Sequence, residues 1–561
     1  MRTLVIAGCC SLAVACGGAS RTAPTAPTDE PLTGEAYAHY LRGRLAALEG
    51  DYPRAAAEMR AAAAAAPGEA PIQVALSDVL FRAGRRDQAR AAIEAAEVRF
   101  PDSSEVWREA GRILRGTGLH ADAVHAYHRA IELAPDAEAS YLGLASAELG
   151  MRRPDRAEQA YRDLLRRRPL SVTGHVRLAR RLVVRGKNQE AEQHLRRALE
   201  LDPSHTRARV ALALILRDRG RSREAIALLR DAFDRSSSID IGERLFHELL
   251  EVGDRAGAAA LIGQLDRDDL ELEVRVTFGY LYLQIGEHDA ALRLARLLAQ
   301  RNPTSGPVRL LEGRALADAG KRDEAIAVLL AVAPERQAFT ECRAVAAELA
   351  ARGGKDSEAR AAVEEALRSH PHDAGLIAAQ ALVAEIAGRT AEARATLTAA
   401  LEAKHDDIEL LYALAALEDR QGNPDRAVQL ADRILAREPD HPGALNFIGF
   451  SLADRNVDLA RAERLLARAL ELSPGDGYVL DSVGWLRFHQ KRYQDALALL
   501  ERAARLAPTE PEILWHLGEL HLAMREPRRA LAVYERARAL GPDEPVRRRI
   551  EARIQALRAQ P

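Results

Sequence analysis

An alanine recurs every 33 to 35 residues along most of the chain, and this spacing restricts the fold more than any other feature. A glycine precedes most of these alanines by five residues, and a proline follows many of them after twelve residues. A period of this length predicts a repeat architecture, in which each unit is one supersecondary element that stacks on its neighbours. The alanines in register are Ala55, Ala89, Ala123, Ala157, Ala191, Ala225, Ala258, Ala291, Ala325, Ala359, Ala393, Ala427, Ala462, Ala496 and Ala530.

Residues 104–137 show the repeating unit most clearly. Apolar and small side chains in its first half recur three and four residues apart, which is the spacing of an amphipathic helix. Gly118 favours the left-handed conformation that ends such a helix, and a second helix then runs to Pro135. Trp107 and Tyr127 fill the volume between the two helices. One such hairpin leaves a face uncovered, so it must stack on copies of itself.

This 34-residue helix-turn-helix pattern, with its conserved spacing of Trp, Gly, Ala, Tyr and Pro positions within the chain, resembles the tetratricopeptide repeat. The resemblance spans residues 36–543, or about fifteen repeats. It implies an all-α fold, an α-solenoid wound as a right-handed superhelix. Residues 540–559 follow with an apolar face and an arginine-rich remainder, which predicts a C-terminal capping helix over the open end of the solenoid.

The repeat register is weakest over residues 239–271, after three serines that stand where a proline is expected. We therefore predict an N-terminal array over 36–271 and a C-terminal array over 272–543, followed by the capping helix and tail over 544–561. The alternative is one continuous superhelix that contains a degenerate repeat.

The N-terminus has the features of a lipoprotein signal peptide over residues 1–15. Arg2 precedes an apolar run from Leu4 to Ala15, which is long enough for a signal sequence and too short to span a bilayer. The small residues before Cys16 resemble the bacterial lipobox, which implies that Cys16 is the lipid attachment site. Residues 16–35 have the composition of a flexible tether. Gly17, rather than Asp, after the cysteine implies sorting to the outer membrane by the same resemblance.

Two alternatives to this N-terminus stay open. Cys9 also follows a lipobox-like sequence, but cleavage there would leave a signal core shorter than usual. The other alternative is a plain secretory signal with incidental cysteines.

The composition and motifs give no support for catalysis or for nucleic-acid binding. The chain carries 80 Lys and Arg against 82 Asp and Glu, so neither sign of charge dominates. It contains no zinc-protease, nucleophile-elbow, phosphate-loop, dinucleotide-binding or CxxC motif. We expect a protein that is not an enzyme, with no cofactor and no metal.

The resemblance also implies which residues face a partner, because the first helix of each tetratricopeptide repeat lines the concave surface. One stripe of positions on these helices is basic near the N-terminus, at Arg108, Arg112 and Arg115. It is acidic in the middle, at Asp240, Glu243, Glu273, Glu341, Glu348, Glu409 and Asp419. It is aromatic in the last repeats, at Phe450, Tyr478, Trp485, Phe488 and Trp515. These aromatic residues are our candidate protein-binding stripe, since buried aromatic side chains dominate interface energies. The alternative is that they pack between neighbouring repeats.

Residues 444–542 resemble outer-membrane tetratricopeptide lipoproteins, which include adaptors of periplasmic carboxy-terminal processing proteases. We therefore expect a lipid-anchored, protein-binding scaffold that faces the periplasm and delivers substrates to a protease. The alternative function is an assembly factor for an envelope machine such as a pilus, a secretin or a polysaccharide exporter.

Overall fold

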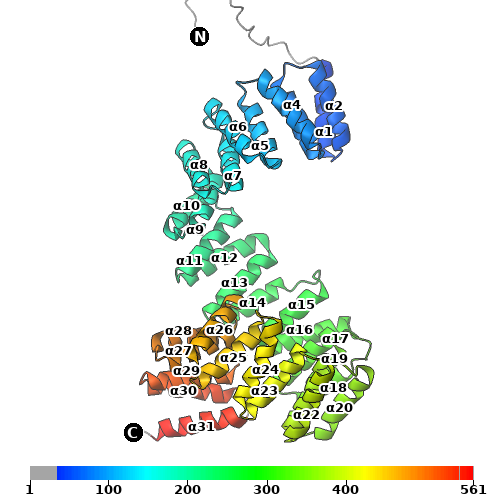
Figure 1. The fold of residues 1–561 in the computed structure, drawn as a ribbon, viewed down its shortest axis with the longest axis vertical. Helices are drawn as coiled ribbons and strands as arrows, with labels where there is room; N and C mark the ends of the chain where they lie inside the picture. Colours follow the sequence, from blue (N-terminus) through cyan, green and yellow to red (C-terminus); the bar gives the residue numbers. More distant parts are fainter. Residues whose placement is uncertain (1–33, 543, 560–561) are drawn as a thin grey trace, which may run out of the picture. The chain divides into compact units, whose positions relative to one another are not determined.

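The structure is a computed structural model that describes residues 34–542 and 544–559. Every regular element in these ranges is an α-helix, and the helices follow one another as helix-turn-helix pairs (Figure 1). The predicted all-α solenoid is confirmed. The predicted signal peptide, the lipid attachment at Cys16 and most of the tether lie outside the described residues.

The chain forms two compact units, which divide between Ile215 and Leu216. The helices that begin in the first unit are α1 (Gly34–Leu48), α2 (Tyr52–Ala65), α3 (Ala70–Arg82), α4 (Arg86–Arg99), α5 (Ser104–Gly116), α6 (His120–Leu133), α7 (Glu138–Gly150), α8 (Pro154–Arg167), α9 (Val172–Val184), α10 (Asn188–Leu201) and α11 (Thr206–Asp218).

The second unit continues the array to the C-terminus. Its helices are α12 (Ser222–Ser236), α13 (Ile239–Glu251), α14 (Arg255–Leu265), α15 (Leu272–Gln284), α16 (His288–Arg301), α17 (Gly306–Asp318), α18 (Arg322–Leu330), α19 (Phe339–Arg352), α20 (Asp356–Ser369), α21 (Ala374–Ile386), α22 (Thr390–Ala403), α23 (Ile408–Arg420), α24 (Pro424–Arg437), α25 (Pro442–Asp454), α26 (Leu459–Leu472), α27 (Gly477–His489), α28 (Tyr493–Leu506), α29 (Pro511–Ala523), α30 (Pro527–Ala539) and α31 (Glu544–Arg558). The predicted division between residues 271 and 272 falls inside this unit, between α14 and α15, and stays a prediction about the repeat arrays.

The last helix, α31, has the position expected of the capping helix. Its residues Ile550 and Ile554 are buried, whereas Arg547, Arg548 and Arg549 are exposed. One apolar face against the preceding repeat and one polar face toward solvent are what the open end of a solenoid requires. The predicted cap is confirmed.

The turn inside each repeat has a left-handed residue even where glycine is absent. Gly118 has a φ of 87°. Arg152, Lys491 and Arg525 stand at the same position of their repeats and have φ values of 57°, 60° and 61°. Because a side chain makes this conformation unfavourable, the packing of the two helices must impose it there.

We predict that Lys491→Gly stabilises the C-terminal repeats by about 0.5–1 kcal/mol, since it relieves an unfavourable backbone conformation at an exposed position. Thermal unfolding followed by circular dichroism measures the change. Lys321→Gly is the matched control, because Lys321 has a φ of −91° and gains nothing from glycine. An equal shift in both variants would contradict the explanation.

A side chain in the first helix ties each of several repeats to the proline that closes the preceding one. Trp107 Nε1 donates a hydrogen bond to the carbonyl of Pro101 at 2.8 Å, and Tyr141 Oη donates to Pro135 at 2.9 Å. Arg309 Nε makes the equivalent bond to Pro303 at 3.1 Å. In each case the partners are six residues apart. The closing proline therefore fixes the entry of the next helix by its carbonyl group as well as ending the helix before it.

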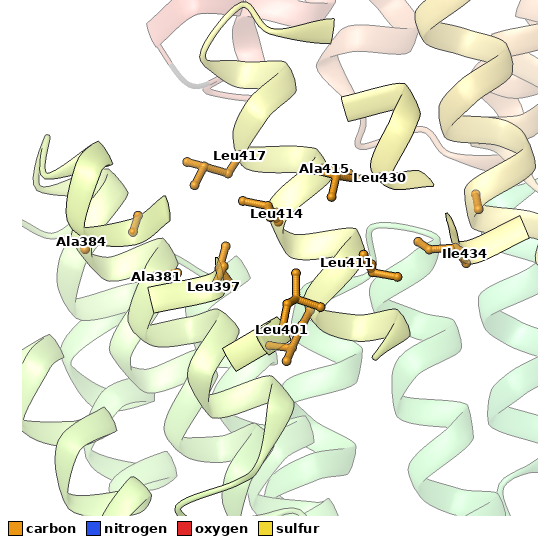
Figure 2. Close-up of a cluster of buried hydrophobic side chains, with 13 residues drawn as sticks. Ala381, Ala384, Leu397, Leu401, Leu411, Leu414, Ala415, Leu417, Leu430 and Ile434 are labelled. Carbon is orange, nitrogen blue, oxygen red and sulfur yellow. The ribbon is translucent and has the colours of Figure 1, made fainter. Parts of the chain in front are cut away.

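The core consists of clusters of buried side chains, mostly leucine and alanine, between successive repeats. Figure 2 shows the part formed by α21, α22, α23 and α24, in which Leu397, Leu414 and Ile434 are almost fully buried. Alanine at the register positions lets the helix axes approach closely, and leucine fills the space that remains. This composition explains why an alanine-rich sequence with few aromatic residues still forms a dense interior.

The second unit also contains one contact between helices that are far apart in sequence. Arg502 on α28 donates from Nε to both carboxylate oxygens of Glu251 on α13, each at 2.8 Å. The turn at Gly253 lies beside the same helix, since a Cβ there would be 3.5 Å from Cδ of Arg505. Repeats within this unit therefore touch more than their immediate neighbours in the chain.

Candidate protein-binding surface

The five predicted stripe aromatics lie on α25, α27 and α29, and the structure brings most of them together. Trp485 is 7% exposed and Trp515 is 8% exposed, whereas Tyr478 is 53% exposed. Phe450 and Phe488 are half-buried. The role of these residues in binding stays a prediction, but Tyr478 is the member that a partner can reach most easily.

Trp485 is the centre of an aromatic cluster. Its ring stacks on Phe488 with centroids 4.5 Å apart, and on His516 with centroids 4.2 Å apart. The indole Nε1 donates to a carboxylate oxygen of Asp454 at 2.9 Å, which satisfies the polar atom of this buried side chain. These contacts favour the alternative given above, in which Trp485 joins neighbouring repeats.

Trp515 lies under the capping helix. Its ring is 5.4 Å from the ring of Tyr534, and the guanidinium carbons of Arg549 and Arg553 lie 5.2 Å and 5.9 Å from its centroid. Both arginines belong to α31, so the cap covers this tryptophan by cation–π contacts. Arg553 is held in turn by Glu519.

A buried histidine pairs with a carboxylate beside this cluster. Nδ1 of His516 lies 2.9 Å from both carboxylate oxygens of Asp481, and both residues are less than a tenth exposed. Burial lowers the pKa of His516, but the charge of Asp481 and its hydrogen bond outweigh that effect and raise the pKa overall. The pair therefore favours a charged imidazolium inside the C-terminal repeats.

Carboxylates crowd the first helices in the middle of the second unit. Burial, together with the charges of Asp373, Asp407 and Glu341, raises the pKa of Glu409. Burial and the charge of Asp454 raise the pKa of Asp419 against the effect of nearby arginines. Burial is the larger cause of both shifts, and neighbouring carboxylates add to it. The predicted acidic zone of the stripe stays a prediction.

The three arginines of the predicted basic patch also lie together, in the first unit. Arg108, Arg112 and Arg115 line one cavity of about 370 Å³ with Tyr127 and Tyr161. Two of them are already paired within the chain. Arg112 donates to Glu109 and to Asp78, and Arg108 lies 3.6 Å from Glu105. These carboxylates reduce the net positive charge of the patch.

The sequence interpretation missed the polar partners of the buried aromatics and the contact between α13 and α28. One signal for the former was present, because Asp481 and His516 interrupt otherwise apolar helices. No local pattern could have paired Glu251 with Arg502, since these residues are 251 positions apart.

Comparison with known proteins agrees with the repeat register. One model described as tetratricopeptide repeat matches residues 384–448 and 487–560, and a second with the same description matches 74–141, 142–180 and 176–238. Together these segments cover more than half of the chain. The chain belongs to the tetratricopeptide repeat (TPR) family.

A short segment of this TPR protein is similar to the TPR repeat-containing protein PA4667 of Pseudomonas aeruginosa. The two are 43% identical over 63 residues, which is 11% of each chain. The match thus spans about a tenth of that relative's length.

Two solved structures align with most of this chain at low sequence identity. Yeast Tom70 has a TM-score of 0.38 and 15% identity, with 82% of this chain and 96% of that chain covered. The chain matched in the APC/C hetero-tetramer Cut9-Hcn1 has a TM-score of 0.33 and 16% identity, with 94% and 97% covered.

TPR proteins are generally non-catalytic scaffolds that bind other proteins. No group of three or more metal-ligating side chains occurs in the part of the chain that the structure describes. None of the helices placed by the structure is long and apolar enough to cross a membrane.

Proposed function

We propose that this TPR protein is a non-enzymatic adaptor, anchored to the outer membrane by a lipid on Cys16, that binds protein partners in the periplasm. In this proposal it holds substrates for a periplasmic protease. The proposed localisation is supported by the signal-like N-terminus. The proposed delivery of substrates to a protease is supported by the resemblance of residues 444–542 to the adaptor lipoproteins.

One observation carries the proposed binding role. Helix α23 of the second unit holds Glu409 and Asp419, and their pKa values are raised first by burial and then by the charges of neighbouring carboxylates. Like charges held together destabilise the folded chain and become favourable when a complementary surface covers them. Tyr478 on α27 adds an exposed aromatic side chain to the candidate stripe, and aromatic residues of this type anchor interfaces.

A photo-crosslinking amino acid at position 478, in the full chain and in living cells, tests the proposal. We expect partners to be captured there because the side chain is exposed and lies on the candidate stripe. Mass spectrometry of the products identifies them. A periplasmic protease and its substrates would support delivery, whereas components of an envelope machine would support the assembly-factor alternative.

The matched control places the same amino acid at Val98, which is 85% exposed on α4. Products at position 478 that do not exceed those at position 98 would contradict a binding role for the stripe. The same cells expressing Cys16→Ser test the anchor, because loss of the lipid should release the protein from the membrane fraction. Unchanged membrane association of Cys16→Ser would contradict attachment at this cysteine.

A further inference from the structure

A cavity of about 840 Å³ lies in the second unit, beside the contact between α13 and α28. Its size is within the range of ligand-binding pockets, which is about 300–1,000 Å³. The ion pair between Glu251 and Arg502 forms part of its wall, and Arg502 also donates to the carbonyl of Pro474 at 3.1 Å. Arg502 therefore joins α13 to the turn at Pro474 through hydrogen bonds and holds this wall of the cavity in place.

The charged side chains that line the cavity are mostly acidic. They comprise five carboxylates and three guanidinium groups, of which two guanidinium groups are already paired. Arg217 donates to Asp218 at 2.9 Å, and Arg502 binds Glu251. The charged residues on the lining are Arg217, Asp218, Asp240, Glu243, Arg244, Glu248, Glu251 and Arg502. Arg244 and the already paired Arg217 are the cations of the lining beside Asp240, Glu243 and Glu248, so carboxylates outnumber guanidinium groups and the cavity attracts positive charge.

Glu248 is the unusual member of this set. It is 4% exposed, and its Oε2 atom is buried and accepts no hydrogen bond from residues 34–542 or 544–559. The nearest cation is Arg217, whose Nε lies 3.6 Å from the other carboxylate oxygen. Burial raises the pKa of Glu248, Arg217 opposes this effect, and the charge of Glu251 adds to it. A buried carboxylate oxygen without a donor is costly, and native structures seldom keep one without a reason.

The sequence around Glu248 points in the same direction. Most other repeats carry an apolar residue at its position in the first helix, as Ile113, Val383 and Leu417 show, and Arg181 and Ser451 are the polar exceptions. An apolar side chain would pack there at no electrostatic cost, so the carboxylate is not needed to hold the helices together. Glu148 also has a buried carboxylate oxygen without a partner, but Glu248 lies in the wall of an acidic cavity, where a donor from another molecule could reach its carboxylate.

We propose that this cavity binds a lysine or arginine side chain from a basic, extended segment of a protein partner, with the cationic group donating to Glu248. This inference rests on the proposed adaptor function and names the chemical class of one of its partners. The cavity is larger than one ammonium group, so the residues that flank the bound side chain also fit inside it. Asp240 and Glu243 are exposed on the same lining and can pair with further cations of the segment. Binding at Glu248 satisfies the unpaired oxygen and requires no rearrangement of the Glu251–Arg502 pair.

Fluorescence anisotropy with the purified full chain tests this inference, with fluorescein-labelled hexalysine as the probe and labelled hexaglutamate as the charge-reversed probe. We expect hexalysine to bind and hexaglutamate not to bind. The double variant Glu243→Gln/Glu248→Gln should weaken hexalysine binding about tenfold or more, since it removes a charge-assisted hydrogen bond and a second carboxylate. Glu243→Gln alone changes an exposed residue and should weaken binding with no effect on the fold.

The matched control is Asp234→Asn/Glu501→Gln, which removes the same charge from exposed positions outside the cavity. We expect less than about a twofold change in that variant, because exposed charges act weakly at physiological salt. Absence of hexalysine binding, equal binding of hexaglutamate, or equal weakening in the two double variants would each overturn the inference. If partners captured at position 478 still bound the cavity variant, the adaptor function would be supported and the role of the cavity in it would be contradicted.

Discussion

Trp485→Ala is expected to lower the free energy of unfolding of the C-terminal repeats by about 3–5 kcal/mol, which is the usual cost of deleting a buried tryptophan. The indole is 7% exposed and stacks on both Phe488 and His516. Its removal leaves a cavity between α27 and α29 and takes the hydrogen bond from Asp454. Denaturant unfolding followed by circular dichroism measures the loss, and amide exchange in α27 and α29 should locate it.

Tyr478→Ala provides the comparison, because its side chain is exposed on the same helix. We expect a change in stability below about 1 kcal/mol for that variant. If Trp485→Ala kept the stability of the wild-type chain and yet lost its partners, Trp485 would be a direct contact and its role in packing would be disproved. The two variants together therefore separate folding from recognition on the aromatic stripe.

Asp481→Asn is expected to cost about 3–5 kcal/mol near pH 6, because it leaves the buried imidazolium of His516 without its carboxylate. The pair raises the pKa of His516 above its ordinary value of 6.5. Stability from a raised histidine pKa is fully present below 6.5 and disappears as the pH rises through the folded-state value. The wild-type chain should therefore lose stability as the pH rises above 6.5 through the raised pKa of His516, and the difference between it and Asp481→Asn should shrink over the same rise.

Thermal unfolding across this pH range measures the effect, with amide exchange in α27 and α29 as the local readout. Asp495→Asn on α28 is the control, since that carboxylate is exposed and pairs with Arg492 at the surface. A pH dependence that is the same in Asp481→Asn and in the wild-type chain would show that the imidazolium contributes nothing to stability.

Much of the fold follows from the sequence because a repeat is specified locally. The alanine register located the helix pairs, and the turn glycines located the left-handed residues. Even the exceptions obey the register, since Arg152 and Lys491 adopt the conformation that glycine has elsewhere. Local patterns sufficed here because each repeat packs mainly on its neighbours in the chain.

Local sequence patterns predict the candidate protein-binding surface less well than they predict the fold. Helical spacing shows that Trp485 and Trp515 share a stripe with Tyr478, but it does not show how closely the next repeat or the cap approaches. Burial of Trp515 depends on Arg549 and Arg553, which lie on α31, and burial of Trp485 depends on His516 of the following repeat. The cavity at Glu248 requires the contact between α13 and α28, which only the curvature summed over many repeats can produce.

The ion pair between Glu251 and Arg502 has a consequence for how this part of the chain can evolve. An open array can gain or lose a repeat at little cost, because each unit depends only on those beside it. Between α13 and α28 the number of repeats is fixed, since deletion of one 34-residue unit would carry Arg502 away from Glu251. Closing so long a loop also adds a non-local step to folding, so these repeats should unfold as one cooperative block instead of fraying singly.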